Sequence, residues 1–285
     1  MKELLPRRAD LDLIDIAFDE SRTRGSFLLQ PPLLRHDGTL YGGTAIAASI
    51  MAMEAATQNA VLWNTTQFVA PAPNGCTIEL LTEKLAAGKR ISQVRVTASV
   101  EGSIVFTSLG STGAPREGGL AGQYEQMPIV AGPDDAEERE YPRPEFPFDH
   151  PDGDVTFRRM CEYRQAAIES TDRVGAGTMM LWSRFNERRE MTPAAIAFLA
   201  DMVPVAVARA AGKLGAGTSL DNSLRFAGVP DTEWVLLEMQ GNFADGGYGH
   251  GMIRVWSENG RLLATGSQTA SMIYVFNQGE QPPHR

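Results

Sequence analysis

The chain has 285 residues, 43% of them hydrophobic, and its 26 Lys and Arg residues are outnumbered by 35 Asp and Glu, a formal net charge of −9. This length suits two domains of ordinary size, and the hydrophobic content is sufficient for packed cores, which excludes a wholly disordered chain. The acidic balance excludes a basic stripe that could neutralise phosphates, so no nucleic acid is expected as a partner.

Neither a secretory signal nor a membrane span is expected. The first twenty residues, MKELLPRRADLDLIDIAFDE, are interrupted by charges and lack the apolar core of a signal peptide. No uninterrupted apolar stretch reaches the roughly 18 residues of a membrane-spanning helix. Two cysteines, Cys76 and Cys161, allow at most one disulfide and fit a reducing compartment. We therefore predict a soluble cytoplasmic protein in which both thiols are inert.

The first half of the chain predicts a strand, a helix and then several strands. Residues 25–29 (GSFLL) form the first predicted strand, and the turn-rich residues 36–43 lead into a helix at 44–57, which has Glu54 as its only charge. A helix that is apolar nearly all round belongs in a protein interior. Four strand-like runs follow, at residues 64–70, 76–85, 90–100 and 104–108. This order indicates one compact α+β domain.

A change of composition separates the two halves. Residues 113–154 are rich in Pro, Gly and acidic side chains, which predicts a linker that crosses the surface. We place the first domain at residues 1–114, the linker at 115–154 and the second domain at 155–285. The second domain shows the same order of elements, with predicted strands at 157–168 and 178–185, a helix at 199–212, and strands at 220–226, 234–243, 249–257 and 262–273.

The helix at residues 199–212 (LADMVPVAVARAAG) is apolar nearly all round and has one carboxylate, Asp201, near its start. Asp201 stands where an N-cap stands, and Pro204 falls in the first turn, where a missing N–H costs little. A helix N-terminus favours the ionised carboxylate and makes it a modest base. Taken alone, Asp201 is explained as a helix cap.

The two halves are related by a constant offset. Adding 158 to the numbers of Phe27, Phe68, Gly88, Ser99, Gly102 and Thr107 gives residues of the same type: Phe185, Phe226, Gly246, Ser257, Gly260 and Thr265. We interpret the chain as two copies of one fold in tandem.

The same offset shows where the copies differ. Gly43 corresponds to Asp201, Val61 to Ser219 and Gly110 to Gln268, so three apolar or glycine positions of the first copy are polar in the second. Buried polar groups that merely satisfy one another remain an alternative for Ser219 and Gln268. Polar groups kept in one copy of a duplicated fold favour a single working site.

Several short motifs occur in register with this repeat. They are Tyr41-Gly42-Gly43, residues 64–68 (NTTQF), Gln126-Met127-Pro128, Leu199-Ala200-Asp201, residues 219–223 (SLDNS) and residues 264–268 (ATGSQ). With these motifs the chain resembles the acyl-CoA thioesterase II family over nearly its whole length. The resemblance implies an α+β tandem (double) hotdog, in which each half wraps an antiparallel sheet around a long central helix.

The resemblance also implies a site. In that family an Asp, a Ser or Thr and a Gln of the second hotdog hold the hydrolytic water, and they correspond here to Asp201, Ser219 and Gln268. The chain departs from the family pattern at Asn222, where a His is common, and at Thr269-Ala270, where Glu-Gly is common. Asp221 and Asn222 are interpreted as residues that secure the start of a strand.

Thioester hydrolysis requires a base for the attacking water and donors for the oxygen that becomes negative. Asp201 is the predicted base, and the hydroxyl of Ser219 and the amide of Gln268 can both donate and accept. Gly42 and Gly43 are predicted to expose oxyanion-binding N–H groups at the start of the first helix, unless they only turn the chain there.

The leading interpretation is a cofactor-free acyl-CoA thioesterase of fatty acid metabolism. The alternatives are a hotdog enoyl-thioester hydratase or dehydratase, which normally needs a His beside the Asp, and a non-catalytic acyl-thioester binding protein. No metal is expected, because the four histidines, 36, 150, 250 and 284, have no ligand spacing. Two hotdogs in one chain already supply the usual dimer, so a homodimer or higher homo-oligomer would associate double units.

Overall fold

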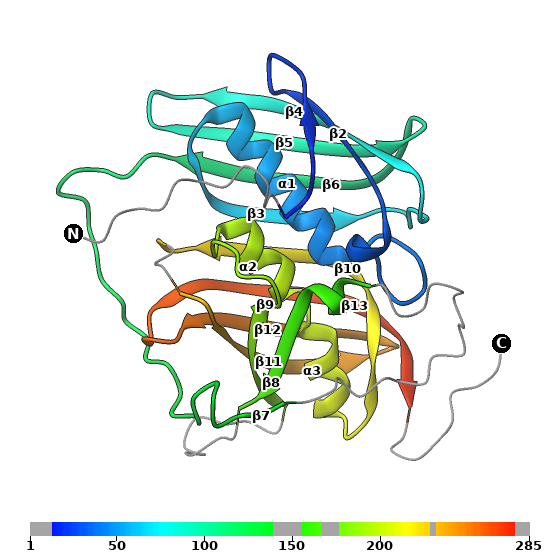
Figure 1. Cartoon of the computed structure of the whole chain (residues 1–285), viewed down its shortest axis with the longest axis vertical. Helices are drawn as coiled ribbons and strands as arrows, with labels where there is room; N and C mark the ends of the chain where they lie inside the picture. Colours follow the sequence, from blue (N-terminus) through cyan, green and yellow to red (C-terminus); the bar gives the residue numbers. More distant parts are fainter. Residues whose placement is uncertain (1–12, 139–155, 167–176, 229–231, 277–285) are drawn as a thin grey trace.

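Figure 1 shows the computed structural model of the chain, which describes residues 13–138, 156–166, 177–228 and 232–276. The first copy contains β1 (Ala17–Phe18), β2 (Arg24–Leu28), the 3-10 turn η2 (Pro31–Leu33), α1 (Gly42–Thr57), β3 (Ala60–Phe68), β4 (Thr77–Ala87), β5 (Ile91–Val100) and β6 (Ser103–Gly113). The second contains β7 (Glu137–Glu138), η3 (Phe157–Met160), β8 (Cys161–Gln165), β9 (Thr178–Phe185), α2 (Pro193–Ala200), α3 (Val203–Ala210), β10 (Leu214–Phe226), β11 (Val235–Asp245), β12 (Tyr248–Ser257) and β13 (Leu262–Phe276).

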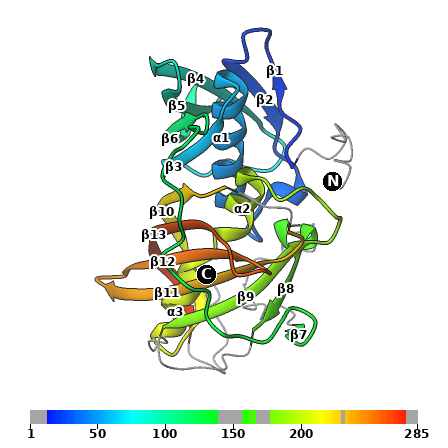
Figure 2. The same ribbon diagram turned by 90° about the vertical axis from the view of Figure 1, so that its left-hand side faces the viewer.

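All described strands belong to one antiparallel sheet of 13 strands, in the order β1-β2-β4-β5-β6-β3-β10-β13-β12-β11-β9-β8-β7. Turned by 90°, the molecule shows the sheet bent around the helices, with α1 in the first copy and α3 in the second (Figure 2). An antiparallel sheet wrapped around a central helix, present twice, is the double hotdog that the sequence predicts.

The two copies join where β3 pairs with β10. Thr65 lies opposite Ser223 in this pairing, and their hydroxyl oxygens are 2.7 Å apart in a hydrogen bond. These residues differ by 158 in number, the offset found in the sequence, so each contacts its own equivalent. The turn glycines Gly102 and Gly260, also one offset apart, both have left-handed φ angles, of 80° and 74°. The structure thus confirms the repeat.

The helix α1 starts at the double glycine and is buried along most of its length. Its many alanines make a slim, apolar cylinder, which allows the sheet to approach it from several sides. The helix ends at Gln58, which adopts a left-handed φ of 56° while its N–H donates to the Glu54 carbonyl. The Glu54 side chain then accepts from the Val61 N–H at 2.9 Å, which ties the helix end to β3.

The helix predicted at residues 199–212 is wrong in its boundaries. The helical segment begins earlier, at Pro193, where the Thr192 hydroxyl accepts from the Ala195 N–H at 3.1 Å as an N-cap. It is interrupted after Ala200, and Met202 is the N-cap of α3. Proline has no N–H and its ring clashes with the carbonyl four residues earlier, so Pro204 prevents a continuous helix through Ala200. Asp201 therefore occupies the break between two helices and is not an N-cap.

The segment that contains this break is also long and apolar enough to cross a membrane. Residues Pro193–Ala210 have a mean hydropathy of 1.5, and 78% of them are buried inside the protein. In Figure 1, α2 lies beside α1 and α3 lies against the strands of the second copy. The segment is accordingly the core helix pair of the second hotdog.

The described part of the predicted linker packs on the second copy. Met127, Val130 and Ala136 belong to a small apolar cluster with Trp182 and Trp256. The Trp182 indole also donates to the Ala131 carbonyl at 2.8 Å. Residues 139–154 of the linker lie outside the described residues, as do 167 and 168 of the predicted strand at 157–168, which starts as the 3-10 turn η3. The domain boundaries stay a prediction.

Candidate active site

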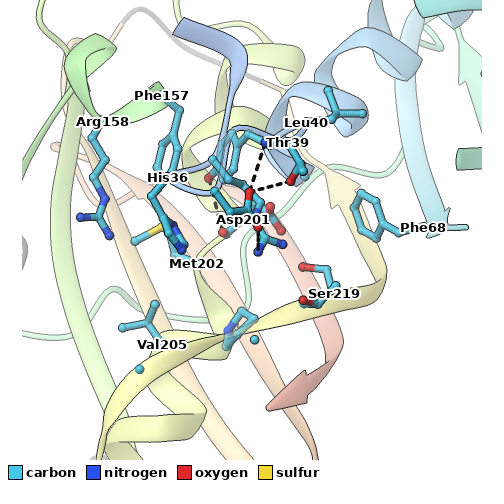
Figure 3. A pocket seen from close by; sticks show the side chains of 18 of the residues that line it. His36, Thr39, Leu40, Phe68, Phe157, Arg158, Asp201, Met202, Val205 and Ser219 are labelled. Carbon is cyan, nitrogen blue, oxygen red and sulfur yellow. Dashed lines mark hydrogen bonds and ion pairs between the residues drawn. The ribbon is translucent and has the colours of Figure 1, made fainter. Parts of the chain in front are cut away.

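A cavity of about 720 Å³ lies where the two copies meet. The first copy contributes the segment before α1, including Arg35 and Leu40, and the end of β3 at Phe68. The second copy contributes Asp201 from the helix break and Ser219 from β10. Figure 3 shows Asp201 at the centre of this region, with Phe68 and Ser219 on one side and Arg158 and Val205 on the other.

The three residues predicted to hold the water come together at this cavity. Gln268, on β13, donates from Nε2 to the Asp201 Oδ1 atom at 2.6 Å and to the Ser219 Oγ atom at 2.7 Å. One amide nitrogen therefore links the carboxylate to the hydroxyl. Because Ser219 Oγ accepts from Gln268, the Ser219 proton is free to donate elsewhere, and this side chain lines the cavity.

Asn222 is a site residue that the sequence prediction missed. Its Nδ2 atom donates to Asp201 Oδ1 at 3.3 Å, and the residue is only 2% exposed. Asp221 does secure the strand, as predicted, since its Oδ1 atom accepts from the Thr269 N–H at 2.9 Å. The sequence contained one signal for this residue, the departure from the family pattern at position 222. Successive side chains of a strand point to opposite faces of the sheet, so Asn222 need not share the role of Asp221.

The Asp201 carboxyl group is buried, with 9% of the residue exposed. Burial is the largest influence and raises its pKa above the ordinary value of 3.8. Hydrogen bonds from Gln268 and Asn222, the charge of Arg35 and a hydrogen bond from the Gly43 N–H act in the opposite direction without cancelling it. The expectation that a helix N-terminus favours the ionised form and makes Asp201 a modest base is thus wrong, because Asp201 ends α2 and its pKa is raised. Asp201 is a stronger base than an exposed aspartate.

Gly42 and Gly43 place the start of α1 directly against Asp201. Gly42 lines the cavity and has the Asp201 carboxylate against its Cα, whereas the Gly43 N–H donates to that carboxylate. A Cβ atom at Gly43 would lie 2.5 Å from the Phe198 carbonyl oxygen. These glycines therefore permit the close approach of α1 and α2. Of the pair, only Gly42 lines the cavity, so its N–H is the one available to a bound substrate.

Tyr41 fixes the helix break from the first copy. Its hydroxyl donates to the Phe198 carbonyl at 3.0 Å and lies 3.3 Å from the Asp201 carbonyl oxygen. Carbonyls near a helix end lack intrahelical partners, and the break at Asp201 creates such an end inside the protein. The Tyr41 ring stacks on Phe157 with centroids 3.8 Å apart. A side chain of one copy thus holds the backbone that carries the carboxylate of the other.

Other reactive groups of the described residues contribute little nucleophilic chemistry. Burial raises the pKa of the Cys161 thiol to about 12 and that of Cys76 to a lesser extent, so neither is a thiolate at neutral pH. Both are free cysteines. Among the described residues no group of three or more His, Cys, Asp or Glu could hold a metal ion; histidines 150 and 284 lie outside them.

Comparisons with known proteins agree with this geometry. Residues 31–113 match the acyl-CoA thioesterase N-terminal domain, and residues 133–272 match the acyl-CoA thioesterase C-terminal domain. A candidate thioesterase from Novosphingobium aromaticivorans is 30% identical, with 90% of this chain and 97% of that chain covered and a TM-score of 0.79. No curated protein sequence matches the chain.

Two further solved structures share the fold at lower identity. A hot dog fold protein from Alicyclobacillus acidocaldarius is 21% identical over 90% of this chain and 95% of its own, with a TM-score of 0.75. The acyl-CoA thioesterase II TesB2 from Mycobacterium marinum is 18% identical over 91% and 96%, with a TM-score of 0.70. Because both family domains match in order across most of the chain, this double hotdog protein belongs to the acyl-CoA thioesterase family and is a thioester hydrolase.

Proposed function

We propose that this protein hydrolyses acyl-CoA thioesters by attack of a water molecule that Asp201 activates. The observation that carries the proposal is the pair of hydrogen bonds from Gln268, which join the buried carboxylate and the Ser219 hydroxyl at the wall of the cavity. Since Asp201 and Ser219 are both within 2.7 Å of one nitrogen, a single water can reach both of them.

The reaction then assigns one role to each side chain. The water accepts a hydrogen bond from Ser219 and gives a proton to Asp201 while its oxygen attacks the thioester carbonyl carbon. The carbonyl oxygen becomes negative and is stabilised by the N–H of Gly42 at the N-terminus of α1. The carbon–sulfur bond breaks, the proton on Asp201 passes to the leaving thiolate, and the products are a carboxylic acid and a thiol. Gln268 and Asn222 hold Asp201 in place throughout.

Asp201→Asn tests the assignment of the base. The amide has nearly the same shape but takes no proton from water, so we expect the rate of thiol release to fall by about 10²- to 10⁴-fold. The measurement is release of free thiol from a panel of acyl-CoAs, with circular dichroism to verify the fold. Asp221→Asn is the matched control, because the Asp221 carboxylate accepts from Thr269 in β13. Retention of more than about a tenth of the turnover by Asp201→Asn would show that Asp201 is not the general base.

The two alternatives predict different products from the same panel. A hydratase would remove the enoyl absorbance without releasing thiol, and a binding protein would saturate with substrate without turnover. The described donors to Asp201 are amides, from Gln268, Asn222 and the Gly43 backbone, which suits a held carboxylate more than an Asp–His pair. Free thiol is the outcome that supports the proposal.

The proposal also includes the cellular compartment, the self-association and the metabolic role of the protein. Two free cysteines support a reducing compartment such as the cytoplasm. Since one chain already contains two hotdogs, self-association would pair double units, which size-exclusion chromatography with light scattering measures directly. We assign the protein to fatty acid metabolism on the strength of the proposed substrate.

A further inference from the structure

Charged side chains are distributed unevenly along the cavity. Among the described lining residues Arg35 is paired with Asp37, whose carboxylate oxygen lies 2.6 Å from its guanidinium, and Asp201 is the proposed base. The other lining residues with full charges are all cationic: Arg158, Arg209 and Lys213, referred to below as the three cations. Counted over the described lining residues alone, positive charge thus exceeds negative charge on one part of the cavity wall, in a chain with a net charge of −9.

The three cations lie away from the apolar residues on the Phe68 side of the cavity. Arg209 is in the last turn of α3 and Lys213 follows the helix, whereas Asp201 precedes it. Eight residues of helix correspond to about 12 Å along its axis, so the cavity wall extends that far from the carboxylate toward Arg209. Arg158 lies on the same side of Asp201 as Val205 of α3 (Figure 3). Phe68 lies on the opposite side (Figure 3). Val69 follows it in the chain and donates its N–H to the Val105 carbonyl, and both valines line the cavity.

The titration of His36 supports a positive potential in this region. This imidazole lines the cavity, and its burial is the largest cause of a pKa lowered to about 4. The charges of Arg35 and Arg158 lower that pKa further, while Asp37 opposes them. His36 is therefore neutral at neutral pH. The charge of Arg158 thus reaches His36 and contributes a positive potential at this part of the wall.

We propose that the three cations bind the phosphate groups of a CoA carrier, so that the carrier lies along α3 and the acyl chain extends toward Phe68 and Val105. This inference rests on the proposed function, because it places the thioester between these two regions. Guanidinium and ammonium groups are the usual protein donors for phosphate. Arg209 is exposed at the cavity edge, a position that suits a carrier entering from solvent. Three separate cations match several phosphates better than the single carboxylate of an acidic acyl chain.

The experiment compares substrates that share one acyl group but differ in carrier. The acyl group is presented on CoA, on CoA without its 3′-phosphate, and on pantetheine without the nucleotide. We expect the ratio of kcat/KM for acyl-CoA to that for acyl-pantetheine to fall on the order of tenfold in each of Arg158→Gln, Arg209→Gln and Lys213→Gln. The change should lie mainly in KM, and raising the salt concentration should weaken the wild-type preference.

Two neighbouring substitutions serve as matched controls. Arg159→Gln changes the exposed arginine next to Arg158, and Lys89→Gln changes an exposed lysine in the turn between β4 and β5; neither side chain lines the cavity. The carrier ratio should keep its wild-type value in both. An unchanged ratio in all three cation variants would overturn the proposal. So would losses confined to substrates with a terminal carboxylate on the acyl chain, or a wild-type preference for an acyl carrier protein over CoA.

A binding measurement separates this inference from the proposed hydrolysis. Calorimetric titration with free CoA and with CoA lacking the 3′-phosphate requires no turnover. We expect wild type to bind CoA more tightly and Arg209→Gln to lose on the order of tenfold in affinity. If CoA binds in this way but no thioester is cleaved, the proposed function fails and the phosphate site stands. If thioesters are cleaved while the cation variants bind CoA like wild type, the phosphate site fails alone.

Discussion

Two opposing influences act on the carboxyl group of Asp201. Burial disfavours its charged form and raises the pKa, whereas Gln268 and Asn222 donate hydrogen bonds that favour the charged form. The net direction is upward from 3.8. A base must be ionised to accept a proton, so the rate should fall as the pH decreases through this raised pKa.

The acidic limb of the pH profile therefore reports on Gln268. Gln268→Leu removes a donor to the carboxylate and keeps the site dry, so the limb of kcat/KM should move to higher pH, and the plateau should fall by about 10- to 100-fold. The measurement is kcat/KM for one acyl-CoA across the pH range in which the protein stays folded. In Asp221→Asn, where the Asp201 contacts remain, the limb should keep its position. A limb that stays at the wild-type pH in Gln268→Leu would mean that Asp201 is not the titrating base.

For individual residues, the sequence predicted which side chains meet but not all of their partners. The offset of 158 identified Asp201, Ser219 and Gln268 because each is polar where the first copy is not. The contact of the Asn222 Nδ2 atom with Asp201 depends on which face of β10 turns inward. A bulge near Ser219 shifts the register of this strand. The residue types alone do not indicate such a register shift.

Between α2 and α3 the helical segment is interrupted and forms a corner that carries Asp201. Pro204 excludes the helical hydrogen bond to Ala200, and Asp201 adopts φ −79° and ψ 57° at the end of α2. The sequence indicated an apolar core helix and located Pro204 in a first turn, both of which are confirmed. It did not predict that a second helix precedes the break, because Asp201 followed by apolar residues is also the pattern of an ordinary cap.

Tyr41→Phe tests whether the corner needs its support from the first copy. The substitution keeps the ring on Phe157 and removes only the hydroxyl that donates to the Phe198 carbonyl. Leaving a buried carbonyl without its donor costs about 1–3 kcal/mol, so the free energy of unfolding in urea should fall by that amount. We also expect kcat to fall, because Asp201 loses a fixed backbone.

Tyr248→Phe is the control for this prediction, since Tyr248 is 53% exposed on β12. Its unfolding free energy and turnover should remain those of wild type. If Tyr41→Phe is destabilised but turns over as fast as wild type, the hydroxyl stabilises the fold and does not position Asp201.

Across the whole molecule the duplication makes one site from two unlike contributions. The second copy supplies Asp201, Ser219 and Gln268, and the first supplies the start of α1 and the Tyr41 hydroxyl. The copies were recognisable from the sequence because paired residues kept a gapless spacing. The continuous sheet that they form through β3 and β10 could not be predicted from the sequence. Pairing between edge strands depends on shape and on complementary side chains such as Thr65 and Ser223.

In the proposed mechanism water, and not the Asp201 carboxylate, attacks the thioester. A single turnover with enzyme in excess, in water enriched in heavy oxygen, tests it most directly, with mass spectrometry of both the acid product and the peptide that contains Asp201. We predict that the acid carries the heavy oxygen after its first turnover and that the Asp201 peptide carries none. Unlabelled acid together with heavy oxygen in the Asp201 peptide would contradict the account, because Asp201 would then be the nucleophile.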